Sequence, residues 1–299
     1  MFPILLPFFE APPRLCFRES KPPMIIHTRI AVSSWSLHKA LGITHANGPA
    51  GSDNAPPKET FGAAQIALLD LPAALRAHGY ARLELCHFHL SGFDTVYLEE
   101  VRSAFKDAGV IIQTLLIDDG DITNPTTRAR DMAWINKCIG AAARLGAVHA
   151  RVIAGKQKPT AETLALSVSG LTHLTNSAAS HGVKLVTENW LETTPTPVEV
   201  HHILDRVPGL GFLADTGNWG GTTKYSDLES IFARAQLCHA KAYFNGANLD
   251  EKDYAACITA GENVGYKGPY TLIFADEGDE WEGLCKERAL ILGLIQPPN

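Results

Sequence analysis

From residue 29 onward, short apolar runs alternate with longer stretches in which apolar residues recur every three or four positions. The short runs are rich in Val, Ile and Leu, as is typical of strands covered by helices. They predict strands over residues 29–34, 81–87, 110–117, 148–153, 184–188, 211–215, 237–242 and 270–274. The longer stretches predict helices over residues 63–78, 96–108, 127–145, 160–181, 198–205, 226–235, 251–262 and 280–292. Pro72 falls inside the first, so that helix could instead begin there, with Asp70 as its cap.

This alternation predicts an α/β protein, a single-domain (β/α)8 TIM barrel over residues 29–295. The alternative is an open, doubly wound sheet. It would usually show fewer strands and a glycine-rich first turn, and neither GxGxxG nor GxxxxGK[ST] occurs. Residues 1–28 are proline-rich and predict an irregular N-terminal arm, in which translation could start at Met1 or Met24. Residues 43–60 predict a long loop of the kind that forms lids or insertions.

Composition narrows the class of protein. The 299 residues are 45% hydrophobic and 19% charged, which is an ordinary globular balance. A net charge of −6 argues against nucleic acid as a partner, and no apolar run is long enough for a membrane helix. The start lacks a basic segment and a clear cleavage site, so no secretory signal is expected. The 6 cysteines form no CxxC pair, which favours reduced thiols and a cytoplasmic location.

Polar residues end three consecutive predicted strands. Glu188 closes the fifth strand, Asp215 closes the sixth, and His239 lies in the seventh. In a barrel the catalytic groups project from the carboxyl ends of strands, so these side chains should meet. A buried carboxylate needs a counter-charge, and no basic residue adjoins Glu188 or Asp215 in the sequence. The three residues therefore predict a site for one divalent ion, which could be Mn²⁺, Mg²⁺, Co²⁺ or Zn²⁺.

The segments around these residues resemble a known family. They read TENW, LADTGNW and CHAKAYF, accompanied by VSSWS in the first predicted strand and LELCHFHL in the second. In this order they resemble the sugar phosphate isomerase/epimerase branch of the xylose-isomerase-like TIM barrel superfamily. The resemblance implies a metal-dependent isomerase or epimerase acting on a sugar or sugar phosphate, and a possible homo-oligomer. It also implies a Glu, an Asp and a His as metal ligands on strands five to seven, matching Glu188, Asp215 and His239.

The eighth strand departs from the family pattern. The resemblance implies a fourth ligand there, a Glu that shares proton transfer with the strand-five Glu, but Ile273 stands near that position. A 1,2-proton shift needs a base and an acid beside a polarised carbonyl. Glu188 is one candidate for these catalytic roles. Its partner could be Glu277, Asp276 or Lys241, of which Lys241 is predicted to share a face with His239.

Other side chains are candidates for binding the substrate. Arg151 could hold a phosphate or carboxylate, or else form a buried ion pair. Trp35 and Trp190 follow strand ends and could pack against a sugar ring. Glu84 and His87 cannot both point inward from a regular strand, but beyond the strand end His87 or His89 could line the pocket. In contrast, Asp118, Asp119 and Asp121 predict a solvated loop.

Three other activities compete with an isomerase. A metal-dependent sugar or polyol dehydratase would use the same ion and base. Loss of the strand-eight Glu could also mark a non-catalytic sugar-binding barrel. The superfamily includes DNA-repair endonucleases, but these require a three-metal cluster, and Asn218 occupies a position where the resemblance implies a further His.

Overall fold

The computed structural model describes residues 27–51 and 61–295. The predicted arm over residues 1–28, with the candidate start at Met24, therefore lies almost wholly outside the described residues. Much of the predicted loop over residues 43–60 lies outside them as well.

Eight parallel strands close into a barrel. They are β1 (Ile30–Ser33), β2 (Arg82–Cys86), β3 (Ile111–Ile117), β4 (His149–Val152), β5 (Lys184–Glu188), β6 (Gly211–Asp215), β7 (Leu237–Lys241) and β10 (Tyr270–Ile273). Each strand pairs with the next, and β10 pairs with β1 to complete the ring. The predicted single-domain barrel is confirmed, and the open sheet is wrong.

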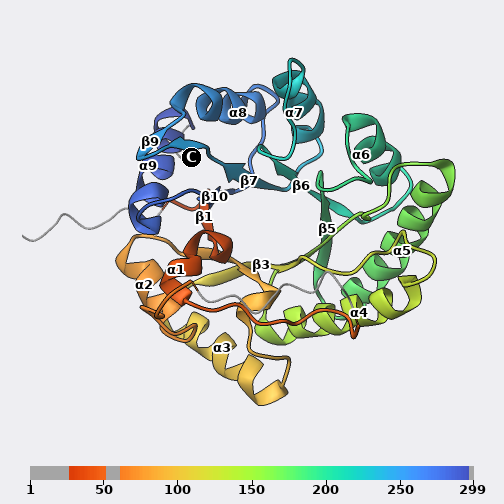
Figure 1. The fold of residues 1–299 in the computed structure, drawn as a ribbon, viewed down its shortest axis with the longest axis horizontal. Helices are drawn as coiled ribbons and strands as arrows, with labels where there is room; N and C mark the ends of the chain where they lie inside the picture. Colours follow the sequence, from red (N-terminus) through yellow and green to blue (C-terminus); the bar gives the residue numbers. More distant parts are fainter. Residues whose placement is uncertain (1–26, 52–60, 296–299) are drawn as a thin grey trace, which may run out of the picture.

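Helices surround the strands and bury their outer faces (Figure 1). They are α2 (Leu71–Ala77), α3 (Thr95–Asp107), α4 (Arg128–Leu145), α5 (Ala161–Ser180), α6 (Pro197–Leu204), α7 (Lys224–Phe232), α8 (Glu251–Asn263) and α9 (Glu280–Leu294). Five short elements were not predicted: η1 (Ser34–Leu37), α1 (His38–Leu41), η2 (His87–His89), β8 (Phe244–Asn245) and β9 (Asn248–Leu249). All five follow strand ends, on the side where barrel loops form active sites.

Helix ends follow local capping chemistry. The Thr160 hydroxyl accepts a hydrogen bond from the backbone N–H of Thr163, and the Thr163 side chain bonds back to complete a capping box. Gly146 ends α4 with φ of 72°, a conformation that costs glycine little. The predicted cap at Asp70 is wrong, because its side chain makes no capping hydrogen bond at the start of α2.

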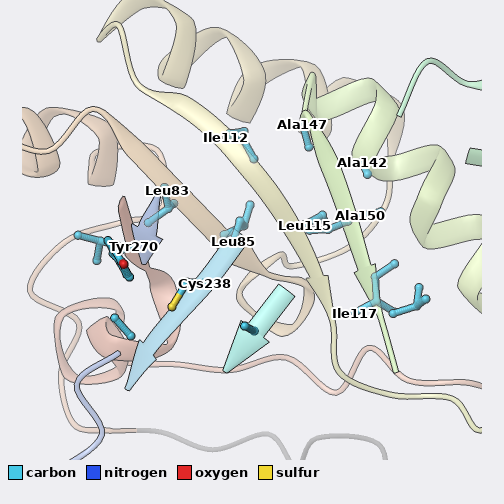
Figure 2. Packing of buried hydrophobic residues seen from close by; sticks show 14 of the residues in the cluster. Leu83, Leu85, Ile112, Leu115, Ile117, Ala142, Ala147, Ala150, Cys238 and Tyr270 are labelled. Carbon is cyan, nitrogen blue, oxygen red and sulfur yellow. The ribbon is translucent and has the colours of Figure 1, made fainter. Parts of the chain in front are cut away.

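The core has an outer and an inner part. Leu83, Leu85, Ile112, Leu115 and Ile117 belong to the cluster between the strands and the helices, part of which Figure 2 shows. Alternate residues point the other way, so Val186, Leu213 and Leu237 form a separate cluster inside the barrel. Five of the cysteines lie among the described residues and are free, and four of these are buried. No described helix is both long enough and apolar enough to span a membrane.

Candidate metal centre and active-site cavity

A cavity of about 200 Å³ opens at the carboxyl ends of the strands. Thirteen residues at strand ends and in the loops after them form its wall. Leu116 and Ile273 are aliphatic, and the other eleven are polar, charged, tryptophan or cysteine residues. The full set is Ser33, Trp35, Cys86, Leu116, Asp118, Arg151, Glu188, Trp190, Asp215, Asn218, His239, Lys241 and Ile273. A concave site with a few converging polar groups at this end is the usual position of a barrel active site.

The three predicted metal ligands meet in this cavity. One donor atom from each of Glu188, Asp215 and His239 lies within 4.8 Å of the other two, and all three residues are buried. His239 Nδ1 lies 3.6 Å from Glu188 Oε1 and 3.5 Å from Asp215 Oδ2. Neighbouring strands produce this arrangement, because Asp215 and His239 are register partners across β6 and β7.

Glu84 holds the other side of the imidazole. Its Oε2 lies 2.6 Å from His239 Nε2, and its Oε1 accepts a hydrogen bond of 2.9 Å from the Thr114 hydroxyl. A carboxylate on one ring nitrogen directs the other nitrogen toward a metal and makes it a stronger ligand. Burial lowers the pKa of His239, but the negative charges of Glu188 and Glu84 outweigh it and raise that pKa well above its usual value. A cation and a proton therefore compete for Nδ1.

Both candidate-ligand residues, Glu188 and Asp215, are held in place by amides. Asn189 and Asp215 exchange two hydrogen bonds, from the Asn189 side chain to the Asp215 carbonyl and from the Asp215 N–H to the Asn189 side chain. The Gly217 N–H donates to Asp215 Oδ1 at 2.6 Å. Asn218 donates to Glu188 Oε1 at 2.9 Å. The amide groups of the TENW and DTGNW segments thus orient the two acids toward the cavity.

The donor set fits a divalent cation. Two carboxylate oxygens and one imidazole nitrogen are the ligands that Mn²⁺, Mg²⁺, Co²⁺ and Zn²⁺ accept. Glu188 Oε2 is buried and has no hydrogen-bond partner among the described residues. A buried carboxylate oxygen needs a nearby positive charge to offset its lost hydration, and Arg151 Nε at 3.1 Å supplies one such charge here. Within the described residues, this is the single group of His, Cys, Asp and Glu side chains close enough to hold an ion.

Arg151 takes part in a buried charge network. Its Nε lies 3.1 Å from Glu188 Oε2, its terminal nitrogen pairs with Asp118, and its guanidinium lies 5.1 Å from the ring of Trp190. Burial lowers the pKa of Arg151, but Asp118 and Glu188 outweigh it and raise that pKa above its usual value. Arg151 therefore forms the buried ion pair that was one of its two predicted roles. Arg151 also lines the cavity.

Not every predicted site residue lies in the cavity. Trp35, Trp190 and Lys241 line it. His87 is fully buried against Trp134, with its Nδ1 3.3 Å from the Leu116 carbonyl, and it lies outside the cavity wall. Glu277 is exposed and lies 3.6 Å from the Lys39 amine.

The end of β10 places an apolar side chain in the wall. Ile273 lines the cavity beside Lys241, its register partner on β7. Asp276 does not take the place of the missing glutamate. Its side chain is not part of the cavity wall and accepts a hydrogen bond from the backbone N–H of Phe244. Ile273 thus faces the cavity where the family resemblance implies a glutamate.

The expectation of a solvated loop after β3 is wrong. Asp119 is 1% exposed and pairs with the Lys156 amine at 2.7 Å. Asp121 accepts hydrogen bonds from Thr123 and Gln157 that lower its pKa despite burial. Asp118 lines the cavity and pairs with Arg151. These acids are tolerated away from solvent because Arg151 of β4, and Lys156 and Gln157 of the loop after β4, form ion pairs or hydrogen bonds with them.

Comparison with known proteins agrees with this fold. Residues 72–289 match the model of the xylose isomerase-like TIM barrel family. The chain belongs to this family. No curated protein matches the sequence significantly.

Solved structures share the fold at low identity. The 3-keto-D-glucoside 4-epimerase YcjR from E. coli is 15% identical, with a TM-score of 0.62 over 88% of this chain and 99% of that one. A xylose isomerase-like TIM barrel protein from Mycobacterium smegmatis, in complex with magnesium, is 15% identical, with a TM-score of 0.65 over 89% and 96%. A D-allulose 3-epimerase from Methylomonas sp. is 16% identical, with a TM-score of 0.65 over 92% and 100%.

Proposed function

We propose that this chain is a divalent-metal-dependent isomerase or epimerase acting on a sugar, sugar phosphate or polyol. The observation that carries the proposal is the buried cluster of Glu188, Asp215 and His239, with Glu84 behind the imidazole. Family membership and the sugar epimerases among its structural relatives support the substrate class. The proposal includes a cytoplasmic location and a homo-oligomer. Size-exclusion chromatography would check the oligomeric state.

Three residues would hold the ion. Glu188, Asp215 and His239 supply two oxygens and one nitrogen, and water or substrate oxygens complete the coordination. A bound divalent ion polarises a substrate carbonyl and so acidifies the neighbouring C–H bond.

Glu188 is the proposed base. Its Oε2 makes no hydrogen bond among the described residues and lies 3.1 Å from Arg151 Nε, and because a carboxylate oxygen has two lone pairs, one stays available for a substrate proton. Asn218 holds Oε1 and Arg151 lies beside Oε2, and together they keep the carboxylate facing the cavity. Trp35 and Trp190 form aromatic walls against which the apolar face of a sugar ring packs.

Lys241 is the proposed second proton-transfer group. It lines the cavity beside Ile273, whereas Glu277 is exposed on the loop after β10. Its ammonium can donate a proton or hold a substrate oxygen. Glu277 could act only after a movement of that loop, so we assign this role to Lys241.

A dehydratase is the second candidate function, and Ile273 favours it. Elimination of water needs one base at the C–H bond and a cation at the departing hydroxyl, with no second carboxylate on the opposite face. Glu188 and Lys241 suffice for such a reaction. A non-catalytic sugar-binding barrel is the remaining alternative that Ile273 leaves open.

One set of measurements distinguishes these activities. Elemental analysis of the purified protein tests for the ion. The protein is then incubated in D₂O with Mn²⁺ and a panel of ketoses and 3-keto-glucosides. Deuterium uptake with a product of equal mass, after correction for the label, supports the isomerase. Loss of water supports the dehydratase, and binding without either change supports the non-catalytic protein. Absence of metal binding contradicts the proposal.

A further inference from the structure

A second cavity lies at the opposite mouth of the barrel. Its volume is about 580 Å³, and its wall contains the first residues of several strands. Lys184 begins β5, Arg82 begins β2 and His149 begins β4, while Lys267 precedes β10. All barrel strands are parallel, so their amino ends meet at this mouth, away from the metal cluster. We call this space the basal cavity.

The basal cavity is lined by cations. Arg29, Arg82, Lys184 and Lys267 contribute to its wall, and no Asp or Glu of the described chain lines it. Arg29 is neutralised by Glu262 at 2.6 Å. The other three form no ion pair with any residue that the structure describes. Three unpaired cations around one cavity repel each other and attract anions, although the whole chain carries a net charge of −6.

Buried polar groups fix part of this wall. The Arg82 guanidinium donates to Gln113 Oε1 at 2.6 Å, and Gln113 Nε2 lies 3.1 Å from His149 Nδ1. Gln113 is 4% exposed and His149 is 8% exposed. Lys184 is the register partner of His149 across β4 and β5. The Arg82 fork is therefore held by one nitrogen, which leaves its other N–H groups available to a ligand.

The rest of the wall is apolar. Leu210, Leu237 and Pro269 line the basal cavity together with parts of Leu185 and Val186. The volume falls in the range of small-molecule sites and exceeds what one phosphate group occupies. A ligand that fits both surfaces carries a multiply charged anion and a less polar body.

We propose that the basal cavity binds a phosphorylated small molecule. Its phosphate oxygens lie among Arg82, Lys184 and Lys267, and its organic part lies on Leu210 and Leu237. Arginine matches phosphate oxygens with paired N–H groups, and lysine adds a compact charge. The site is at the other end of the barrel from the metal cluster, so it does not depend on the proposed reaction.

Isothermal titration calorimetry on the full chain tests this site. The protein is kept free of metal with EDTA, and pyrophosphate, ATP and fructose 6-phosphate are titrated separately at constant ionic strength. We expect one ligand per chain, and tighter binding of ATP than of pyrophosphate because of the apolar surface. Binding of no probe overturns the proposal, and equal binding of ATP and pyrophosphate overturns the assignment of the organic part.

Charge-matched variants locate the binding. In Lys184→Gln/Lys267→Gln both substituted side chains are exposed, so the fold is preserved and melting temperature verifies this. Each lost charge-assisted hydrogen bond weakens binding about tenfold or more, so this variant should bind ATP at least about tenfold more weakly. Lys158→Gln/Lys252→Gln removes the same charge from exposed lysines outside the cavity wall and should leave the affinity unchanged. Equal weakening in both variants, or unchanged affinity in the first, overturns the proposal.

Discussion

Replacing Glu84 with Gln should weaken metal binding although Glu84 is not a proposed ligand. Glu84 Oε2 lies 2.6 Å from His239 Nε2, on the side of the ring opposite the donor nitrogen. The substitution keeps the size of the side chain and its ability to accept a hydrogen bond from the ring. It removes the negative charge that makes the imidazole a stronger ligand.

The expected loss follows from the position of this carboxylate. Removing such a partner of a metal-bound histidine typically reduces affinity about 10- to 100-fold, which is about 1.4–2.7 kcal/mol. Glu84 is 0% exposed, so solvent screens its charge little and we expect a loss within this range. Calorimetric titration of Mn²⁺ into the metal-free protein measures the change at neutral pH.

A matched control separates this effect from a general loss of charge. Glu99→Gln removes one carboxylate from the exposed surface of α3 and should leave the Mn²⁺ affinity unchanged. A Glu84→Gln protein with unaltered affinity and an unaltered melting temperature would refute the link between Glu84 and the ion.

Three further predictions concern the base, pH and packing. Glu188→Gln should reduce deuterium uptake into a ketose by at least about 100-fold, because general bases contribute about 10²–10⁴ in rate; uptake at the rate of the unaltered protein would remove Glu188 from this role. Burial raises the pKa of Glu287 well above its usual value, so the folded chain loses stability as pH rises through the interval between the unfolded and folded pKa. Glu287→Gln should therefore raise the melting temperature at pH 8 and change it little at pH 4, where the carboxyl is protonated in both states; an equal change at both pH values would contradict this sign. Gly268→Ala should cost about 1–3 kcal/mol of unfolding free energy in urea melts, because a Cβ there would lie 2.2 Å from the Gln236 carbonyl oxygen. The control Gly220→Ala should cost little, because no atom lies within 4 Å of a Cβ at that position. Similar losses in both variants would contradict the packing argument.

The fold was predictable because periodicity along the chain is strong. The observed bounds of Lys184–Glu188 and Gly211–Asp215 are those predicted from their apolar runs. The clustering of the three candidate metal ligands was predictable for a related reason, since each is a polar residue in or at the end of a buried strand. Parallel strands bring such residues to one mouth of the barrel whatever their distance in the sequence.

The surroundings of the ligands were harder to predict. Strand β2 stops at Cys86, so His87 enters η2 and turns into the protein, while Glu84 points toward His239. The period of two placed Glu84 and His87 on different faces, but it could not tell which face lies inside. Burial of Asp119 depends on Lys156, which lies 37 positions away. Contacts over such separations carry no local pattern in the sequence.

Ile273 has a consequence for how the protein would acquire the proposed ion. The described chain offers three candidate ligands, whereas Mn²⁺ or Mg²⁺ takes about six, so solvent and substrate would have to supply the rest. We therefore expect retention of the proposed ion to depend on its concentration in the surroundings, and its exchange with the medium to be rapid. The ion in this barrel is therefore expected to behave as a supplied co-reactant whose availability sets the active fraction, rather than as a permanent part of the folded chain.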